Sequence, residues 1–334
     1  MAQLPDAFDI FYGRISLNKR PCDKIESAAS GLITYLSAEY GVSQDRVFLQ
    51  GSYPNGTAVE PEDKDRGEYD VDLVCDGIDP GWTATAALDD LEEKLATHGT
   101  YEKLLRGADS RKKPCVRLFY AEDEIGAFHV DVVPARPSQS SDLHAPLEVP
   151  RRESGWHDTA PREYTVWCRD RGGRFARTVR MLKRWRDHSQ DTRKSIKSIV
   201  LQVLAAQHLG GQSSDAAALV GTLVAIQGAL APDPDTAPSV ENPVLRSEDL
   251  AARWDDSAYR DFRKHLANAV DLAQRGLHES DERTSHDLWR HLLGPDFPEY
   301  RLQESGIDAG VLPATPPPGH HRTQAVPRRN EYGL

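Results

Sequence analysis

A pair of aspartates inside an apolar segment is the feature that most constrains this chain. The segment Tyr69–Cys75 alternates acidic and apolar side chains, a pattern that is typical of a β-strand. Residues i and i+2 of a strand point to the same face, so Asp70 and Asp72 project together while the valine between them points to the other face. Two carboxylates this close repel each other unless a cation or a proton lies between them. Taken alone, the pair is also compatible with an ordinary outward face of a half-exposed strand.

The residues around this strand favour a site over a plain exposed face. A short apolar run, 47–49, leads into Gly51-Ser52 and a polar turn, and such a turn can hold phosphates with backbone N–H groups and a hydroxyl. A third carboxylate, Asp131, lies in a second apolar strand, 127–133. Carboxylates suit Mg²⁺, which usually takes one or two of them together with substrate phosphates. Three carboxylates on neighbouring strands therefore predict a two-metal site for in-line phosphoryl displacement.

The remaining pattern divides the chain into a mixed half and a helical half. Apolar spacing predicts helices over 22–39 and 83–98, and an acidic turn joins strands 115–120 and 127–133 into a hairpin. Residues 135–162 form a Pro/Ser/Arg-rich connector, and from Val311 onward the prolines predict a flexible tail. Between these segments, helices are expected over 174–186, 195–209, 215–230, 247–275 (in one or two pieces) and 281–293.

Charge is distributed unevenly along the 334 residues. The net charge of −11 argues against a protein that coats duplex nucleic acid. From Arg162 to Lys197, however, twelve Lys and Arg stand against four Asp and Glu, a local charge of +8 that leaves −19 for the rest. On the helix within this segment, Lys183 lies at the edge of the apolar face, where its long stem can deliver the ammonium to a cleft. The distribution indicates small polyphosphate substrates held between the two halves.

Cysteine usage and hydropathy indicate a cytoplasmic protein. The four cysteines, at 22, 75, 115 and 168, form no CxxC pair, which fits a reducing compartment better than a disulfide framework or a zinc site. The longest apolar stretch, 216–231, is too short to span a bilayer, and the N-terminus lacks the pattern of a secretory signal. No membrane association is expected.

Several segments together resemble the polymerase-β-like nucleotidyltransferases, and within them the bacterial cGAS/DncV-like nucleotidyltransferases (CD-NTases). The resemblance implies an α+β fold: a nucleotidyltransferase palm with a mixed sheet and an oligoadenylate-synthase-like helical domain, two lobes around a central cleft. The implied domains are 1–160 for the catalytic core, with an N-terminal helix spanning both lobes, 161–310 for the helical domain and 311–334 for the tail. The segments that carry the resemblance are Leu49–Ala58, Tyr69–Val74, Phe128–Ala135, Met181–Trp185 and Lys197–Gln202.

One departure from the family pattern is the spacing of the first two motifs. Seventeen residues separate Ser52 from Asp70, more than the shortest family spacings. The extra residues, 60–67, are expected to form an exposed loop.

The resemblance also implies roles for individual residues. Two Mg²⁺ ions, which Mn²⁺ could replace, would bind the three aspartates, and Asp131 would orient or deprotonate the attacking ribose hydroxyl. Ser195 is a competing alignment for Ser198, and Arg180 is a further candidate contact. The implied catalytic and metal-binding residues are Asp70, Asp72 and Asp131, and the implied nucleotide-binding residues are Gly51, Ser52, Lys183 and Ser198, with Ser195 and Arg180 as additional candidates.

The function implied by this resemblance is synthesis of a cyclic di- or trinucleotide second messenger from NTPs such as ATP and GTP, with release of pyrophosphate, in antiphage (CBASS) signalling. Two alternatives stay open: a nucleotidyltransferase that modifies an RNA end, a protein or a small molecule, and an inactive nucleotide- or RNA-sensing module. A longer basic track would be expected of an RNA-tailing enzyme. Retention of the three aspartates with Gly51-Ser52 counts against an inactive module.

Other features carry less weight. His129 shares the face of Asp131, where a histidine packed beside the site is favoured over one that touches substrate. The family includes synthases that a ubiquitin-transfer-like enzyme conjugates through the C-terminus, and the tail ending Gly333-Leu334 could be such a substrate or a plain tail. No sequence feature identifies the base-stacking residue, the bases used, the linkage or the ring size.

Overall fold

The computed structural model describes residues 4–62, 68–112, 114–123, 126–137 and 145–300. The chain divides into two units, Met1–Tyr300 and Arg301–Leu334. The second unit, which includes the expected tail, lies outside the described residues, and so does most of the expected loop 60–67. Among the described residues, no helix is both long enough and apolar enough to cross a membrane.

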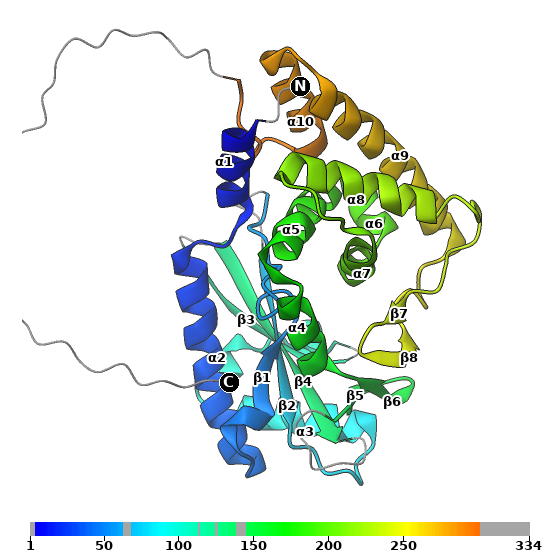
Figure 1. The fold of residues 1–334 in the computed structure, drawn as a ribbon. Helices are drawn as coiled ribbons and strands as arrows, with labels where there is room; N and C mark the ends of the chain where they lie inside the picture. The colour runs from blue at the N-terminus through cyan, green and yellow to red at the C-terminus, as the bar shows by residue number, and fades with distance from the viewer. Residues whose placement is uncertain (1–3, 63–67, 113, 124–125, 138–144, 301–334) are drawn as a thin grey trace, which may run out of the picture. The chain divides into compact units, whose positions relative to one another are not determined.

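A mixed sheet carries the acidic strands (Figure 1). Its order is β1-β2-β4-β5-β6, with β3 paired to β4. The β2 and β4 strands run parallel, and the other pairs are antiparallel. The hairpin and the acidic strand predicted from the sequence are confirmed. The strands are β1 (Val47–Gln50), β2 (Glu68–Asp76), β3 (Val116–Asp123), β4 (Gly126–Pro137), β5 (Leu147–Arg151) and β6 (Gly155–Thr159).

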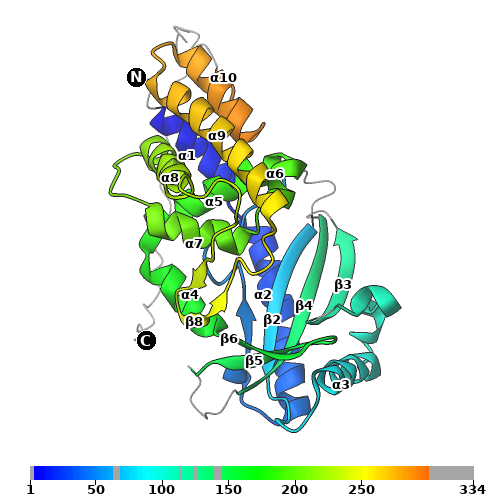
Figure 2. The same cartoon turned by 90° about the vertical axis from the view of Figure 1, so that its right-hand side faces the viewer.

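Two helices predicted from apolar spacing pack with this sheet. They are α2 (Lys19–Tyr40) and α3 (Ala84–Thr97), and Figure 2 shows α2 behind β2 and β4 and α3 near β5. The α2 helix begins after Asn18, whose side chain accepts from the Arg20 amide, and ends at Gly41 in the left-handed conformation. Leucines at 32, 36, 73, 91 and 95 are fully buried in the core that these elements share.

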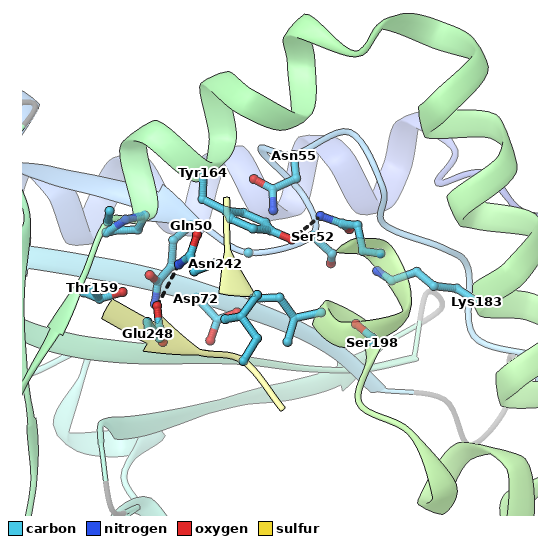
Figure 3. Close-up of a pocket in the computed structure, with 16 residues that line it drawn as sticks. Gln50, Ser52, Asn55, Asp72, Thr159, Tyr164, Lys183, Ser198, Asn242 and Glu248 are labelled. Atoms are coloured by element: carbon cyan, nitrogen blue, oxygen red, sulfur yellow. Dashed lines mark hydrogen bonds between the residues drawn. The ribbon is translucent and has the colours of Figure 1, made fainter. Parts of the chain in front are cut away.

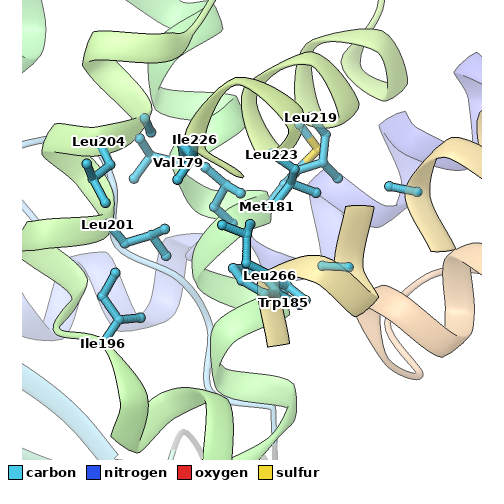
Figure 4. Close-up of a cluster of buried hydrophobic side chains, with 14 of the residues drawn as sticks. Val179, Met181, Trp185, Ile196, Leu201, Leu204, Leu219, Leu223, Ile226 and Leu266 are labelled. Atoms are coloured by element: carbon cyan, nitrogen blue, oxygen red, sulfur yellow. The ribbon is translucent and has the colours of Figure 1, made fainter. Parts of the chain in front are cut away.

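A second core lies in the helical half around α5 (Gly172–His188), as Figure 4 shows. The first helix, α1 (Pro5–Ile15), contributes Phe8 to this core. The Phe8 ring packs edge-on against Trp289, with 4.9 Å between the ring centroids. The N-terminal segment thus supplies one helix to each core, with the chain bending between α1 and α2. The other helices are α4 (Pro161–Asp170), α6 (Gln190–Ser195), α7 (Ser198–His208), α8 (Asp215–Ala229), α9 (Asp256–His278) and α10 (Glu282–Leu293), and short 3₁₀ turns cover Gln44–Arg46, Glu102–Leu104 and Gly107–Ser110.

Three expectations about secondary structure are wrong. The connector 135–162 contains the end of β4 and the hairpin β5–β6, which extends the sheet. The helix expected over 195–209 is α7, but its start is wrong: α7 begins at Ser198, because Ile196 and Lys197 adopt extended backbone between α6 and α7. The helix expected over 247–275 is a strand, β8 (Leu245–Asp249), followed by α9; β8 pairs with β7 (Glu241–Asn242) in a separate two-stranded sheet.

Glu60, expected in an exposed loop, is instead buried where the two halves meet. Its carboxylate accepts from the backbone and side-chain amides of Asn18 at 2.9 and 3.0 Å and from the Tyr69 hydroxyl. Arg184 of α5 donates to the Glu60 carbonyl at 2.6 Å. A carboxylate with this many donors can be buried without a large penalty, so the extra residues after Ser52 begin as part of the packed structure.

Candidate active site

A turn after β1 forms one wall of the candidate site. Gly51 has a φ of 82°, a conformation that favours glycine, and a Cβ there would lie 2.6 Å from an Asp72 carboxylate oxygen. The turn is closed by hydrogen bonds from the Asn55 amide to the Gly51 carbonyl and from the Thr57 amide to the Ser52 carbonyl. Only glycine fits at position 51, and its missing side chain lets the turn lie directly against Asp72.

The three predicted carboxylates lie on adjacent parallel strands. Asp72 of β2 is the register partner of Asp131 of β4, and Asp70 is the partner of His129. The pKa of Asp72 is raised to about 7, chiefly by burial and also by the neighbouring charges of Asp131 and Asp70, while Arg117 opposes the shift. The repulsion expected from the sequence is therefore present at this position.

Arg117 is a site residue that the sequence analysis missed. It lies on β3 opposite Asp131 and binds that carboxylate with two hydrogen bonds of 2.6 and 2.7 Å. Its guanidinium is also 3.6 Å from Asp70, which contacts His129 as well. The predicted hairpin does not reveal this pairing, because a register irregularity between Tyr120 and Asp123 shifts the strands relative to each other.

The carboxylates suit a divalent cation by their chemistry. Their oxygens are hard ligands, and their mutual repulsion is what a cation would relieve. In the arrangement seen, Arg117 neutralises Asp131, and no group of three acidic, His or Cys side chains among the described residues is placed to hold a metal ion. A metal bound by Asp70, Asp72 and Asp131 therefore requires the Arg117 pair to open or shift.

A pocket joins the β1 turn and Asp72 to the helical half (Figure 3). Asp72 lines it, whereas Asp70 and Asp131 lie outside the lining. From the helical half, Lys183 and Ser198 reach the pocket, as expected from the sequence. The full lining is Gln50, Gly51, Ser52, Asn55, Asp72, Thr159, Ala160, Pro161, Tyr164, Lys183, Ser198, Ile199, Gln202, Asn242, Glu248 and Leu250.

Lys183 is the single Lys or Arg among the residues that line this pocket. Its side chain is buried, and its ammonium donates to the Thr57 carbonyl at 2.9 Å. The pKa of Lys183 is lowered to about 8, chiefly by burial and also by the nearby charge of Arg186. The ammonium is therefore held beside the β1 turn by one neutral acceptor, in a place where a phosphate would stabilise its charge.

Neutral hydrogen bonds connect the turn to the helices behind it. Thr57 donates to the Gln202 side-chain carbonyl at 3.0 Å, and the Gln202 amide donates to the Tyr164 hydroxyl at 3.0 Å. All three side chains are buried. This network fixes the Tyr164 ring at the pocket wall. No pattern in the sequence distinguishes Tyr164 from the other ten tyrosines.

Ser198 is the first residue of α7, and Ile199 beside it is 39% exposed and lines the pocket. Ser195, the competing alignment, is buried in α6 and donates to the Thr192 carbonyl, away from this pocket. The break between α6 and α7 separates the two serines.

Several other basic residues of the positive segment form packing contacts. Arg180 donates to the Tyr12 and Ser16 hydroxyls and does not line the pocket, so its candidate role as a nucleotide contact stays a prediction. Arg177 pairs with Asp215, and Arg184 is buried at the contact between the halves. Most of the local positive charge on α5 therefore holds the helical half together.

The sequence model of one family matches residues 2–172, just over half of the chain. That model describes a Second Messenger Oligonucleotide or Dinucleotide Synthetase (SMODS) domain. The chain belongs to this family. It is a bacterial CD-NTase, and hence a nucleotidyltransferase, with an α+β fold of the polymerase-β-like kind. Divalent metal ions are the general cofactors of this family.

Relatives of this CD-NTase include two characterised by their products. The c-di-GMP synthase of Roseivirga ehrenbergii is 24% identical over 300 residues, covering 80% of this chain and 77% of the relative. The cyclic AMP-AMP-AMP synthase of an Acinetobacter species is 25% identical over 286 residues, covering 82% and 78%.

Solved structures share the fold of this CD-NTase. CdnG of Bradyrhizobium diazoefficiens, in complex with GTP, matches with a TM-score of 0.70 and 17% identity over 87% of this chain and 96% of CdnG. DncV of Vibrio cholerae, a cyclic AMP-GMP synthase in complex with a linear intermediate, matches with a TM-score of 0.55 and 17% identity over 89% and 87%.

Proposed function

We propose that this CD-NTase joins NTPs into a cyclic di- or trinucleotide at the pocket between the β1 turn and α7. The observation that supports it most is the convergence of Gly51, Asp72 and Lys183 on one pocket from three distant segments. The products of the two named relatives, a cyclic dinucleotide and a cyclic trinucleotide, support the product class.

The chain's own residues would act by binding and orientation. The β1 turn would hold the triphosphate with its backbone amides and the Ser52 hydroxyl, and Ser198 would add a hydroxyl at the start of α7. Lys183 would exchange the Thr57 carbonyl for a phosphate oxygen. Because the phosphate carries negative charge, this exchange gives the buried ammonium a stronger partner.

The carboxylates would complete the site. Asp131 would orient the attacking ribose hydroxyl or accept its proton. We propose that Asp70, Asp72 and Asp131 hold two Mg²⁺ ions, which Mn²⁺ could replace. When bound, these ions would neutralise charge on the triphosphate and polarise the α-phosphorus. The last transfer, which closes the ring, would use the same groups on the linear intermediate.

The cellular setting is part of the same proposal. We expect the enzyme in the cytoplasm, where NTPs are available and thiols stay reduced, and all four cysteines are free thiols in the structure. Its expected role is CBASS antiphage signalling. A ubiquitin-transfer-like conjugating enzyme acting on the C-terminal residue is a proposed partner. Intact-mass measurement after incubation with that enzyme and ATP would show the adduct, and an unchanged mass would contradict it.

The test of the main proposal is product analysis. Purified protein would be incubated with Mg²⁺ or Mn²⁺ and each labelled NTP, singly and in pairs, then with phosphatase, before mass spectrometry. Phosphatase-resistant cyclic products are expected, and Asp70→Asn with Asp72→Asn should abolish them. Asp23→Asn, in an exposed ion pair on α2, is the matched control that should leave the yield unchanged. Linear products or adducts alone would favour transfer to another acceptor.

A further inference from the structure

The pocket has a second polar end, far from Lys183 and Ser198. Figure 3 shows Thr159, Asn242 and Glu248 grouped at that end, with Asp72 between the two groups. In the proposed function the phosphates occupy the end with Lys183. The opposite end is then where the base of the same nucleotide would lie.

A short hairpin delivers the polar groups to this end. Asn242 of β7 is buried, and its side-chain amide donates to Glu248 of β8 at 2.7 Å. The side-chain oxygen of Asn242 accepts from the backbone amide of Val244 at 3.1 Å. Both polar atoms of the Asn242 side chain are therefore held by hydrogen bonds, and Asn242 orients the Glu248 carboxylate toward the pocket.

The Glu248 carboxylate has unused acceptor capacity. Within the described ranges, Asn242 is its one hydrogen-bond donor, and no Lys or Arg forms an ion pair with it. A carboxylate accepts about four hydrogen bonds, so several lone pairs still face the pocket. A charged acceptor in a partly enclosed pocket favours ligands that present N–H donors to it.

The edges of the four bases differ in how well they match a carboxylate. Guanine presents two adjacent donors, N1–H and the 2-amino group. Adenine and cytosine each pair one amino group with an adjacent ring-nitrogen acceptor, which would face the second carboxylate oxygen. Uracil flanks its one N–H with two carbonyl oxygens. Only guanine can therefore give two hydrogen bonds to a carboxylate without placing an acceptor against it.

We propose that Glu248, oriented by Asn242, makes this pocket select guanine, so that GTP is the nucleotide it binds. This inference rests on the proposed function, because it concerns the base of the nucleotide whose phosphates the β1 turn would hold. Leu250 and Ile199 in the same lining supply apolar surface for the faces of the ring. Selection then comes from the edge of the base, and the ring faces contribute affinity for any purine.

The experiment measures binding of GTP, ITP and ATP to the full chain by calorimetry, using analogues that cannot be hydrolysed between the α- and β-phosphates. ITP is the sharpest probe because it lacks only the 2-amino group. Since a bidentate base contact discriminates by about 1–3 kcal/mol, GTP should bind roughly 5- to 150-fold more tightly than ATP, with ITP between them.

Substitution at Glu248 should remove this discrimination. Glu248→Gln places an amide donor where guanine has donors, so GTP should weaken to about the affinity of ATP while ATP changes little. Glu241→Gln, on the same hairpin but exposed, is the matched control and should bind like the wild type. Thermal unfolding of both variants would verify that the hairpin change has not unfolded the protein.

The outcomes separate the inference from the function on which it rests. Equal affinity of the wild type for GTP, ITP and ATP would overturn guanine selection and leave the proposed function standing. So would a Glu248→Gln variant that is folded and still prefers GTP. Failure to bind any of the three nucleotides would overturn the proposed function itself, and the guanine assignment with it.

Discussion

The burial of Lys183 predicts that nucleotide binding takes up protons above neutral pH. Its pKa is lowered from 10.5 to about 8 by burial, so near pH 8 about half of the molecules carry a neutral amine. A triphosphate beside the ammonium favours the charged form and should return the pKa toward its ordinary value. Binding should therefore take up about 0.5 proton at pH 8 and about 0.9 at pH 9.

Calorimetry measures this uptake directly. A non-hydrolysable NTP analogue would be titrated into the protein at pH 8.5 in two buffers of different ionisation enthalpy, because the difference in apparent binding enthalpy gives the number of protons exchanged. At this pH the free triphosphate is fully ionised and contributes little. Lys183→Met should show almost no uptake, and Lys194→Met, which removes an exposed lysine, should behave like the wild type.

The lowered pKa of Lys183 also determines how the stability of the nucleotide-free protein changes with pH. Because the folded pKa is the lower one, the unfolded chain binds more protons between pH 8 and 10.5, so nucleotide-free stability contributed by Lys183 rises with pH across this window. The full difference is about 3.5 kcal/mol at most, from roughly 1.4 kcal/mol per pKa unit. The prediction of proton uptake would be refuted if the wild type took up no protons on nucleotide binding, or if Lys183→Met took up as many as the wild type.

Three further predictions concern the turn, the acidic strands and the helical core. Gly51→Ala should abolish NTP binding in calorimetry and destabilise the protein by at least ~1–2 kcal/mol, because the new Cβ strains the backbone at positive φ and clashes with the Asp72 carboxylate. Gly13→Ala, at a helical position with open space around it, should leave the stability unchanged or raise it. Arg117→Met removes the cation that faces two carboxylates, so the melting temperature should fall more at pH 8 than at pH 5. Millimolar Ca²⁺ should raise the melting temperature of this variant more than that of the wild type. Equal responses of the variant and the wild type would contradict the pairing. Phe8→Ala should lower the free energy of unfolding by about 3–5 kcal/mol in urea denaturation, and a loss under 1 kcal/mol would show that α1 is not part of the core.

The strand features of the site could be predicted because they follow a period of two. Alternation around Asp70 and Asp72 requires no knowledge of the rest of the fold, and the apolar residues flanking Asp131 mark a buried strand in the same way. Arg117 was missed because its pairing with Asp131 depends on a register irregularity between Tyr120 and Asp123. A one-residue shift in register moves a side chain to the other face of the sheet, so the predicted hairpin alone could not place Arg117 at the site.

The pocket end with Asn242 and Glu248 could not be predicted. The β7 strand has two residues, too few to show an alternating pattern. The helix expected over 247–275 included the last residues of β8, so that strand was not predicted. Likewise, the basic face of α5 gave no sign that Arg180 and Arg184 would bind partners from segments more than one hundred residues away. Such partners are set by tertiary packing, so local spacing could identify Lys183 as a boundary residue but not separate it from its neighbours.

The pairing of Arg117 with Asp131 has a consequence for how the protein can be made. Neighbouring carboxylates that depend on a bound ion would make folding depend on the supply of that ion. Here the guanidinium on β3 supplies positive charge from within the same hairpin. The sheet can then fold without a divalent ion, and the metal ions that we propose for this site would bind in a later step. Folding would therefore precede metal binding.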